Sequence, residues 1–127
     1  MTILPDTKNY GMLLLRICTA LILTVHGVTG MLEDGLSGFG SYLESQGFGL
    51  LGLPLAWIIK LSHVVAAASI LTRKWVMWPV LLTIIILVAG IFMVHLPNGW
   101  FVVGGGFNGI EFNLLLISAL AAILYDR

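Results

Sequence analysis

The sequence predicts an all-α membrane protein built as a four-transmembrane-helix bundle, a single domain covering residues 1–127. Hydrophobic residues make up 59% of the 127 residues and charged residues 9%, with a mean hydropathy of +1.05. Soluble domains carry about a quarter charged residues, so this chain cannot present an ordinary wet surface on all sides. Four apolar segments also approach the roughly 20 residues that cross a ~30 Å hydrocarbon core. They are Gly11–Leu32, Pro54–Thr72, Trp75–His95 and Gly109–Tyr125.

The first apolar segment begins just after Lys8 and carries Arg16 in its first turns. The loop that follows is not plain linker. Between positions 36 and 47, apolar side chains recur at helical spacing against serines and a glutamate, which predicts a short helix lying in the membrane interface. The second and third segments are joined by Arg73 and Lys74 alone, so these two helices must be antiparallel neighbours, as in a four-helix bundle.

Basic residues mark one side of the membrane. In a chain with four spans, the N-terminus, the link between the second and third spans, and the C-terminus all lie on the same side of the membrane. That side carries the basic residues that flank the spans, which are Lys8, Arg73, Lys74 and Arg127. The loops on the other side, 33–53 and 96–108, contain no lysine or arginine. The positive-inside rule therefore predicts that both termini are cytoplasmic.

Composition also excludes several function classes. The net charge is zero, which argues against nucleic acid as a partner, because binding phosphates needs clustered basic residues. A single cysteine, Cys18, rules out an internal disulfide or a dithiol relay. The lipid bilayer is the partner that the composition requires.

Polar residues collect in the outer half of the predicted bundle. At ~1.5 Å per residue, His26 lies roughly 15 Å outward from Arg16, and Lys60 and His63 lie one turn apart on the second helix. His95 and Glu111 flank the Gly-rich loop between the last two helices. Ionisable side chains at such depth are candidates for a functional site.

Purely structural roles for the same residues remain open. Arg16 and Lys60 can snorkel to the headgroups, and the histidines can act as hydrogen-bonding glue between helices. A buried carboxylate must be paired or protonated, so Glu111 can form a purely structural pair with Lys60.

The motifs resemble those of the DoxX family of small four-helix membrane proteins over nearly the whole chain. The chain departs from the family at Lys60, where members often carry an acidic residue. The matching segments are Gly11–Arg16, Val25–Gly27, Gly38–Gly47, Leu71–Arg73 and Val94–Trp100, together with Glu111-Phe112.

The resemblance implies a multi-pass protein of the bacterial cytoplasmic membrane, associated with redox metabolism of sulfur compounds or thiols, and with a quinone as its small ligand. No covalently bound cofactor and no metal site are expected. Partners would be a redox subunit or further copies of the chain. On this reading Glu111, His26 and His95 are the catalytic candidates. The candidate quinone-binding residues are Lys60, His63, Arg16, Asn98 and Trp100.

Three other functions remain open on the sequence. A non-catalytic anchor or assembly subunit of a larger complex explains the small size equally well. A small transporter lined by the same polar residues would require oligomerisation, because four helices enclose only a narrow path. A haem-binding bundle would use two of the three histidines as axial ligands.

Overall fold

The computed structural model describes residues 7–32 and 34–127. Within these ranges the chain is helical, with no strand. The elements in order are α1 (Thr7–Thr29), α2 (Gly35–Leu43), η1 (Glu44–Phe48), η2 (Gly49–Leu51), α3 (Gly52–Thr72), α4 (Met77–Gly90), η3 (Ile91–His95), η4 (Leu96–Asn98) and α5 (Glu111–Tyr125).

Three of the helical stretches are long and apolar enough to cross a membrane. They comprise the 20 residues Tyr10–Thr29, the 38-residue run Gly35–Thr72 that contains α2 and α3, and the 22 residues Met77–Asn98. The prediction of an all-helical chain is confirmed for the described residues, and three of the helical stretches fit the prediction of membrane spans by length and composition. The fourth segment forms α5, which has 15 residues and is therefore about 22 Å long.

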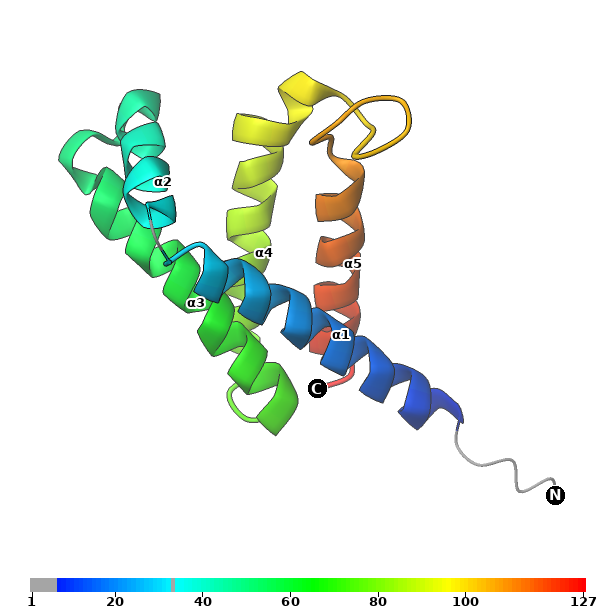
Figure 1. The fold of residues 1–127 in the computed structure, drawn as a ribbon. Coiled ribbons are helices and arrows are strands. Elements are labelled where there is room, and N and C mark those ends of the chain that lie inside the picture. Colours follow the sequence, from blue (N-terminus) through cyan, green and yellow to red (C-terminus); the bar gives the residue numbers. More distant parts are fainter. Residues whose placement is uncertain (1–6, 33) are drawn as a thin grey trace, which may run out of the picture.

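The four principal helices contact one another in a ring. α1 packs on α3, α3 on α4, α4 on α5, and α5 on α1. Figure 1 shows α4 and α5 running side by side while α1 crosses α3 obliquely. The start of α1, the α3–α4 turn and the C-terminus lie at one end, and α2 and the α4–α5 connection lie at the other.

Small residues set the closeness of the α1–α3 crossing. A Cβ atom added at Gly27 would lie 2.9 Å from the carbonyl oxygen of Lys60 and 2.8 Å from a methyl of Val64. Small side chains at such crossings let helix backbones approach each other closely. The buried core continues from this crossing through all four helices, and its larger members are Leu23, Ile70, Val80, Leu120 and Ile123.

The predicted short helix after the first span is confirmed as α2, which packs against α3. Leu36 and Leu43 form a small second core with Ala56. The hydroxyl of Tyr42 donates to the carbonyl of Met93 at 3.2 Å, which ties α2 to the end of the third span. α2 therefore covers the same end of the bundle at which η3 and the α4–α5 connection meet.

Both ends of the third predicted span, Trp75–His95, differ from those of the regular helix α4. α4 begins at Met77 because Arg73 and Trp75 both adopt positive φ (59° and 57°), so the chain turns before it can resume a helix. Its regular part ends at Gly90, and a wide π-turn over Ile91–His95 completes the span. Such turns inside helices occur frequently at functional sites.

Candidate functional site

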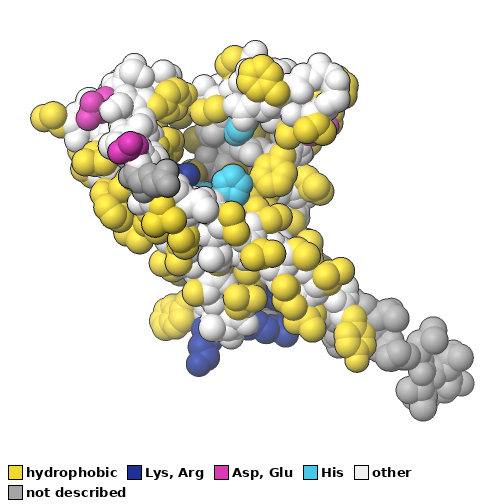
Figure 2. All heavy atoms as spheres, in the orientation of Figure 1, with side chains coloured by type: hydrophobic (Ala, Val, Ile, Leu, Met, Phe, Trp, Pro, Cys, Tyr) yellow, Lys and Arg dark blue, Asp and Glu magenta, His cyan; other side chains and the backbone are white. Residues whose placement is uncertain are grey.

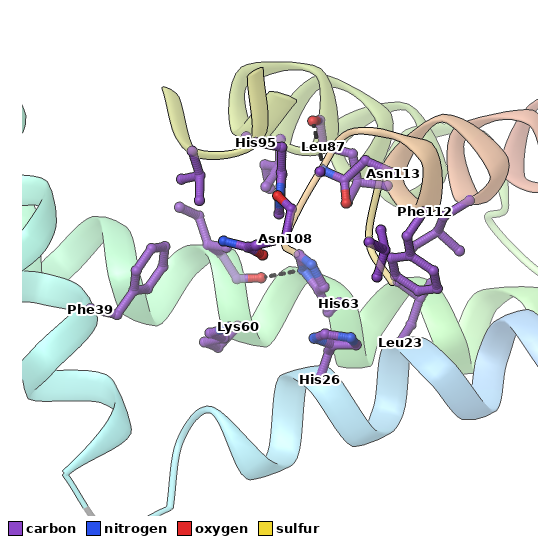
Figure 3. Close-up of a pocket in the computed structure, with 17 residues that line it drawn as sticks. Leu23, His26, Phe39, Lys60, His63, Leu87, His95, Asn108, Phe112 and Asn113 are labelled. Atoms are coloured by element: carbon purple, nitrogen blue, oxygen red, sulfur yellow. Dashed lines mark hydrogen bonds between the residues drawn. The ribbon is translucent and has the colours of Figure 1, made fainter. Parts of the chain in front are cut away.

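A cavity of about 380 Å³ lies inside the bundle at the end covered by α2, within the ~300–1,000 Å³ range of small-molecule sites. All three histidines of the chain line it, one each from α1, α3 and η3. Figure 3 shows His26, His63 and His95 together with Lys60 and Asn108 around this space. The other lining residues are Leu23, Phe39, Ile59, Ile86, Leu87, Gly90, Val94, Val102, Gly109, Phe112, Asn113 and Leu116.

Backbone carbonyls fix two of the imidazole rings. Nδ1 of His63 donates to the carbonyl oxygen of Ile59 at 2.6 Å, and Nδ1 of His95 donates to that of Asn108 at 2.9 Å. A carbonyl oxygen can only accept, so in both rings the proton of the neutral form resides on Nδ1 and Nε2 carries the lone pair. The cavity therefore holds two imidazoles whose Nε2 atoms can accept a hydrogen bond, or donate one after protonation.

Lys60 is held between an aromatic ring and a glycine. Its ammonium group lies 5.1 Å from the centroid of the Phe39 ring, which is a cation–π geometry. A Cβ atom at Gly30 would lie 2.6 Å from Cε of Lys60, so the lysine stem passes directly over this glycine. Lys60 thus reaches the cavity wall from α3 and is oriented by Phe39 of α2 and by the backbone at Gly30, just after α1.

The opposite wall is built by α5. The ring of Phe112 stacks on that of His26 with centroids 6.2 Å apart and an interplanar angle of 29°. The side chain of Asn113 is buried, and its Nδ2 donates to the carbonyl of Leu87 at 3.2 Å, which locks α5 against α4. These contacts fix the positions of the donors and aromatic faces that a ligand would meet.

An apolar groove adjoins the cavity between α2, α3 and α4. Its volume is about 220 Å³, and its walls are almost wholly hydrocarbon. The cavity and the groove share five lining residues, which are Phe39, Ile59, Ile86, Gly90 and Val94. The cavity, whose largely apolar lining carries the histidines, Lys60 and Asn113, therefore shares one wall with a groove that has almost no polar surface, which suits a ligand with a polar head and an apolar tail.

Four of the eight predicted site residues lie outside the cavity lining. Oε1 of Glu111 accepts the backbone N–H of Val102 at 3.0 Å, at the first turn of α5. Asn98 donates to the carbonyl of its own preceding turn, and Trp100 is half-exposed in the loop. Glu111 thus holds the loop segment that contributes Val102 to the cavity, and the structure contains no Glu111–Lys60 ion pair among the residues it describes.

Arg16 is the fourth predicted site residue that lies outside the cavity lining. It lies at the other end of the bundle. Its Nη2 is 3.3 Å from the Asp126 carboxylate and 3.4 Å from the Asp126 carbonyl oxygen. Figure 2 shows most of the visible lysine and arginine side chains gathered at that end, whereas acidic side chains lie at the end with the hollow. Lys60 in the cavity and Asp126 beside Arg16 are the exceptions to this division.

Sequence reasoning missed three residues that shape the cavity. Phe39 was assigned only to the apolar face of the short helix, and neither Asn108 nor Phe112 was assigned to the site. Phe39 and Phe112 supply aromatic contacts to Lys60 and His26, and the carbonyl of Asn108 orients His95. The only signal for Asn108 is its place at the end of a glycine-rich loop, where asparagine tolerates the positive φ of 57° found here.

The chemistry of the donor set favours an organic ligand. Across residues 7–32 and 34–127, no group of three or more His, Cys, Asp or Glu side chains is arranged to hold a metal ion. The lining instead offers an ammonium, imidazole nitrogens and amides set in hydrocarbon. No family model, curated protein or solved structure matches this chain.

Proposed function

We propose that this chain is a quinone-linked redox subunit of the bacterial cytoplasmic membrane, related to the DoxX family, and that its cavity binds the quinone head. The observation that carries the proposal is the wall shared by the cavity, which holds the cluster of polar side chains, and the groove, which is almost wholly apolar. A quinone combines a ring with two hydrogen-bond-accepting carbonyls and a long hydrocarbon tail. The two compartments match these two parts.

The lysine and histidine side chains of the cavity have separate roles in the proposed quinone site. The Lys60 ammonium donates to one quinone carbonyl, and Phe39 and Gly30 keep it in place. Nε2 of His63 or His95 exchanges a proton with the head, since Nδ1 of each ring is committed to a backbone carbonyl. A bound quinone supplies two-electron, two-proton chemistry. The electrons come from a partner subunit, since the chain has one cysteine and no dithiol pair.

The membrane arrangement belongs to the same proposal. We place four spans across the bilayer with α5 as the fourth, because a short apolar helix is accommodated by local thinning of the bilayer. The α3–α4 turn, which carries Arg73 and Lys74, and the C-terminus lie at one end of the bundle (Figure 1). We assign this end to the cytoplasm, so both termini are cytoplasmic. The quinone cavity then opens in the outer half of the membrane.

The test is a quinone titration of the protein in nanodiscs with Lys60→Met and Lys74→Met. Both substitutions remove an ammonium and keep a straight apolar stem, but Lys74 is exposed in the α3–α4 turn, remote from the cavity. A hydrogen bond to a charged group is worth about 1.5–3 kcal/mol. We therefore expect Lys60→Met to weaken quinone binding about 10- to 100-fold and Lys74→Met to leave it unchanged.

A second pair of variants tests whether the apolar groove binds the hydrocarbon tail of the quinone. Ala89 lines the apolar groove and not the histidine-lined cavity, so a larger side chain there fills the proposed tail site alone. Ala89→Leu should weaken binding of a quinone with a decyl tail and spare the same ring without a tail, while Ala89→Ser, which has nearly the same volume as the native residue, serves as control. No saturable binding, or equal binding by all variants, would instead favour a non-catalytic anchor or assembly subunit.

A further inference from the structure

A second cavity, at the basic end of the bundle, has no part in the proposed quinone site. It measures about 320 Å³ and lies between the start of α1, the end of α3 and the C-terminus. Among the residues that the structure describes, two guanidinium groups, Arg16 and Arg73, and one carboxylate, Asp126, line it. One carboxylate cannot neutralise two guanidinium groups, so this described lining carries a net positive charge.

Arg16 has spare capacity to bind an anion. Its side chain is 5% exposed, and within the described part of the chain its one side-chain partner is Asp126, bound through Nη2 at 3.3 Å. Among the residues that the structure describes, Nη1 of Arg16 has no hydrogen-bond partner. A buried donor without a partner is costly, and an anion or water beside it would relieve that cost.

The remaining walls of this cavity are apolar and open to the outside. Leu13 and Ile17 of α1 and Leu71 of α3 line it, and each is about half exposed. These side chains lie on the outer faces of helices that are long and apolar enough to cross a membrane. Whatever anion binds the arginines would therefore have hydrocarbon next to it, as a phospholipid headgroup does.

We propose that this cavity is a binding site for the phosphate group of an anionic phospholipid, held between Arg16 and Arg73. Arginine forms bidentate, charge-assisted hydrogen bonds with phosphate oxygens. Basic pockets between helices at the cytoplasmic side of membrane proteins bind such headgroups. Leu13, Ile17 and Leu71 contact the upper part of the acyl chains, which separates a lipid from free phosphate. The site is independent of the quinone proposal, since the two cavities share no lining residue.

The experiment measures lipid binding to the delipidated full chain in detergent by native mass spectrometry, with phosphatidylglycerol and phosphatidylcholine as probes. The key variant is Arg73→Gln, and its matched control is Lys74→Gln, the same loss of charge one residue further along outside the cavity. A basic residue near an anionic headgroup contributes about fivefold in affinity. We expect Arg73→Gln to lose about fivefold in phosphatidylglycerol affinity and Lys74→Gln to lose less than twofold.

Two further measurements test the site without a substitution at the buried Arg16. Asp126→Asn removes the competing carboxylate and should raise phosphatidylglycerol affinity severalfold. Inorganic phosphate at millimolar concentration should not displace the lipid. The proposal is overturned by equal binding of the two lipids, by equal losses in Arg73→Gln and Lys74→Gln, or by displacement with phosphate, which would indicate a free-anion site.

Discussion

Replacing Gly27 by alanine tests whether the α1–α3 crossing determines the stability of the bundle. The added Cβ would lie 2.9 Å from the Lys60 carbonyl oxygen and 2.8 Å from a Val64 methyl, whereas ordinary contacts begin at 3.4 Å. The helices must therefore separate by about half an ångström. Because Lys60 and His63 sit on the α3 face that meets α1, this separation also widens the histidine-lined cavity.

The magnitude follows from two opposing effects. Overpacking a well-packed contact costs about 1–3 kcal/mol, whereas replacing glycine by alanine inside a helix gains about 0.5–1 kcal/mol. Gly11 provides the matched control, because it lies in the same helix and a Cβ atom there has no heavy atom within 4 Å. Gly11→Ala gains helix propensity alone, so the two variants should differ in unfolding free energy by about 1–3 kcal/mol.

The assay is reversible unfolding in mixed micelles of increasing denaturing-detergent fraction, followed by far-ultraviolet circular dichroism. Gly27→Ala should unfold at a lower denaturing fraction than the unsubstituted chain, and Gly11→Ala at the same fraction or a higher one. Equal midpoints for the two variants would refute the reasoning, because they would show that α1 and α3 have room for a methyl group at their crossing.

Three further predictions concern contacts elsewhere in the bundle. Asn113→Leu removes the hydrogen bond to the Leu87 carbonyl and should lower the unfolding free energy by about 0.5–1.5 kcal/mol in the same assay. Glu111→Gln removes a negative charge from the first turn of α5 and should cost about 0.3–1 kcal/mol; unchanged stability with loss of quinone binding would instead put the carboxylate at the ligand. Replacing both Arg73 and Lys74 with glutamine should produce mixed membrane orientation in a cysteine-accessibility assay, and a uniform, unchanged orientation would contradict the assignment of the basic end to the cytoplasm.

Hydropathy and spacing were sufficient to predict the helical elements. The spans Gly11–Leu32 and Pro54–Thr72 correspond to most of α1 and α3, and the interfacial pattern after the first span located α2. Such signals are local, because a helix in hydrocarbon satisfies its own backbone hydrogen bonds wherever the side chains are apolar. The end of α4 was less predictable, since nothing in the run from Gly90 to His95 marks a change to a wide turn.

Position along the bundle was also readable from the sequence. Counting residues from the ends of the spans put His26, Lys60, His63 and His95 in the same half of the predicted bundle, and the structure brings all four to one cavity. This position depends only on the rise per residue, which is nearly constant in a helix.

Which side chains contact one another was decided only by the tertiary structure. Glu111 was a plausible partner for Lys60 by depth, yet the lysine lies against Phe39 and the glutamate caps the loop at Val102. Arg16, predicted to snorkel or to bind the ligand, is buried beside Asp126, 110 positions away in the chain. Which side chains meet is decided by how each helix is rotated and tilted against its neighbours. Those angles result from close approaches such as that at Gly27, which the sequence records only as a small residue.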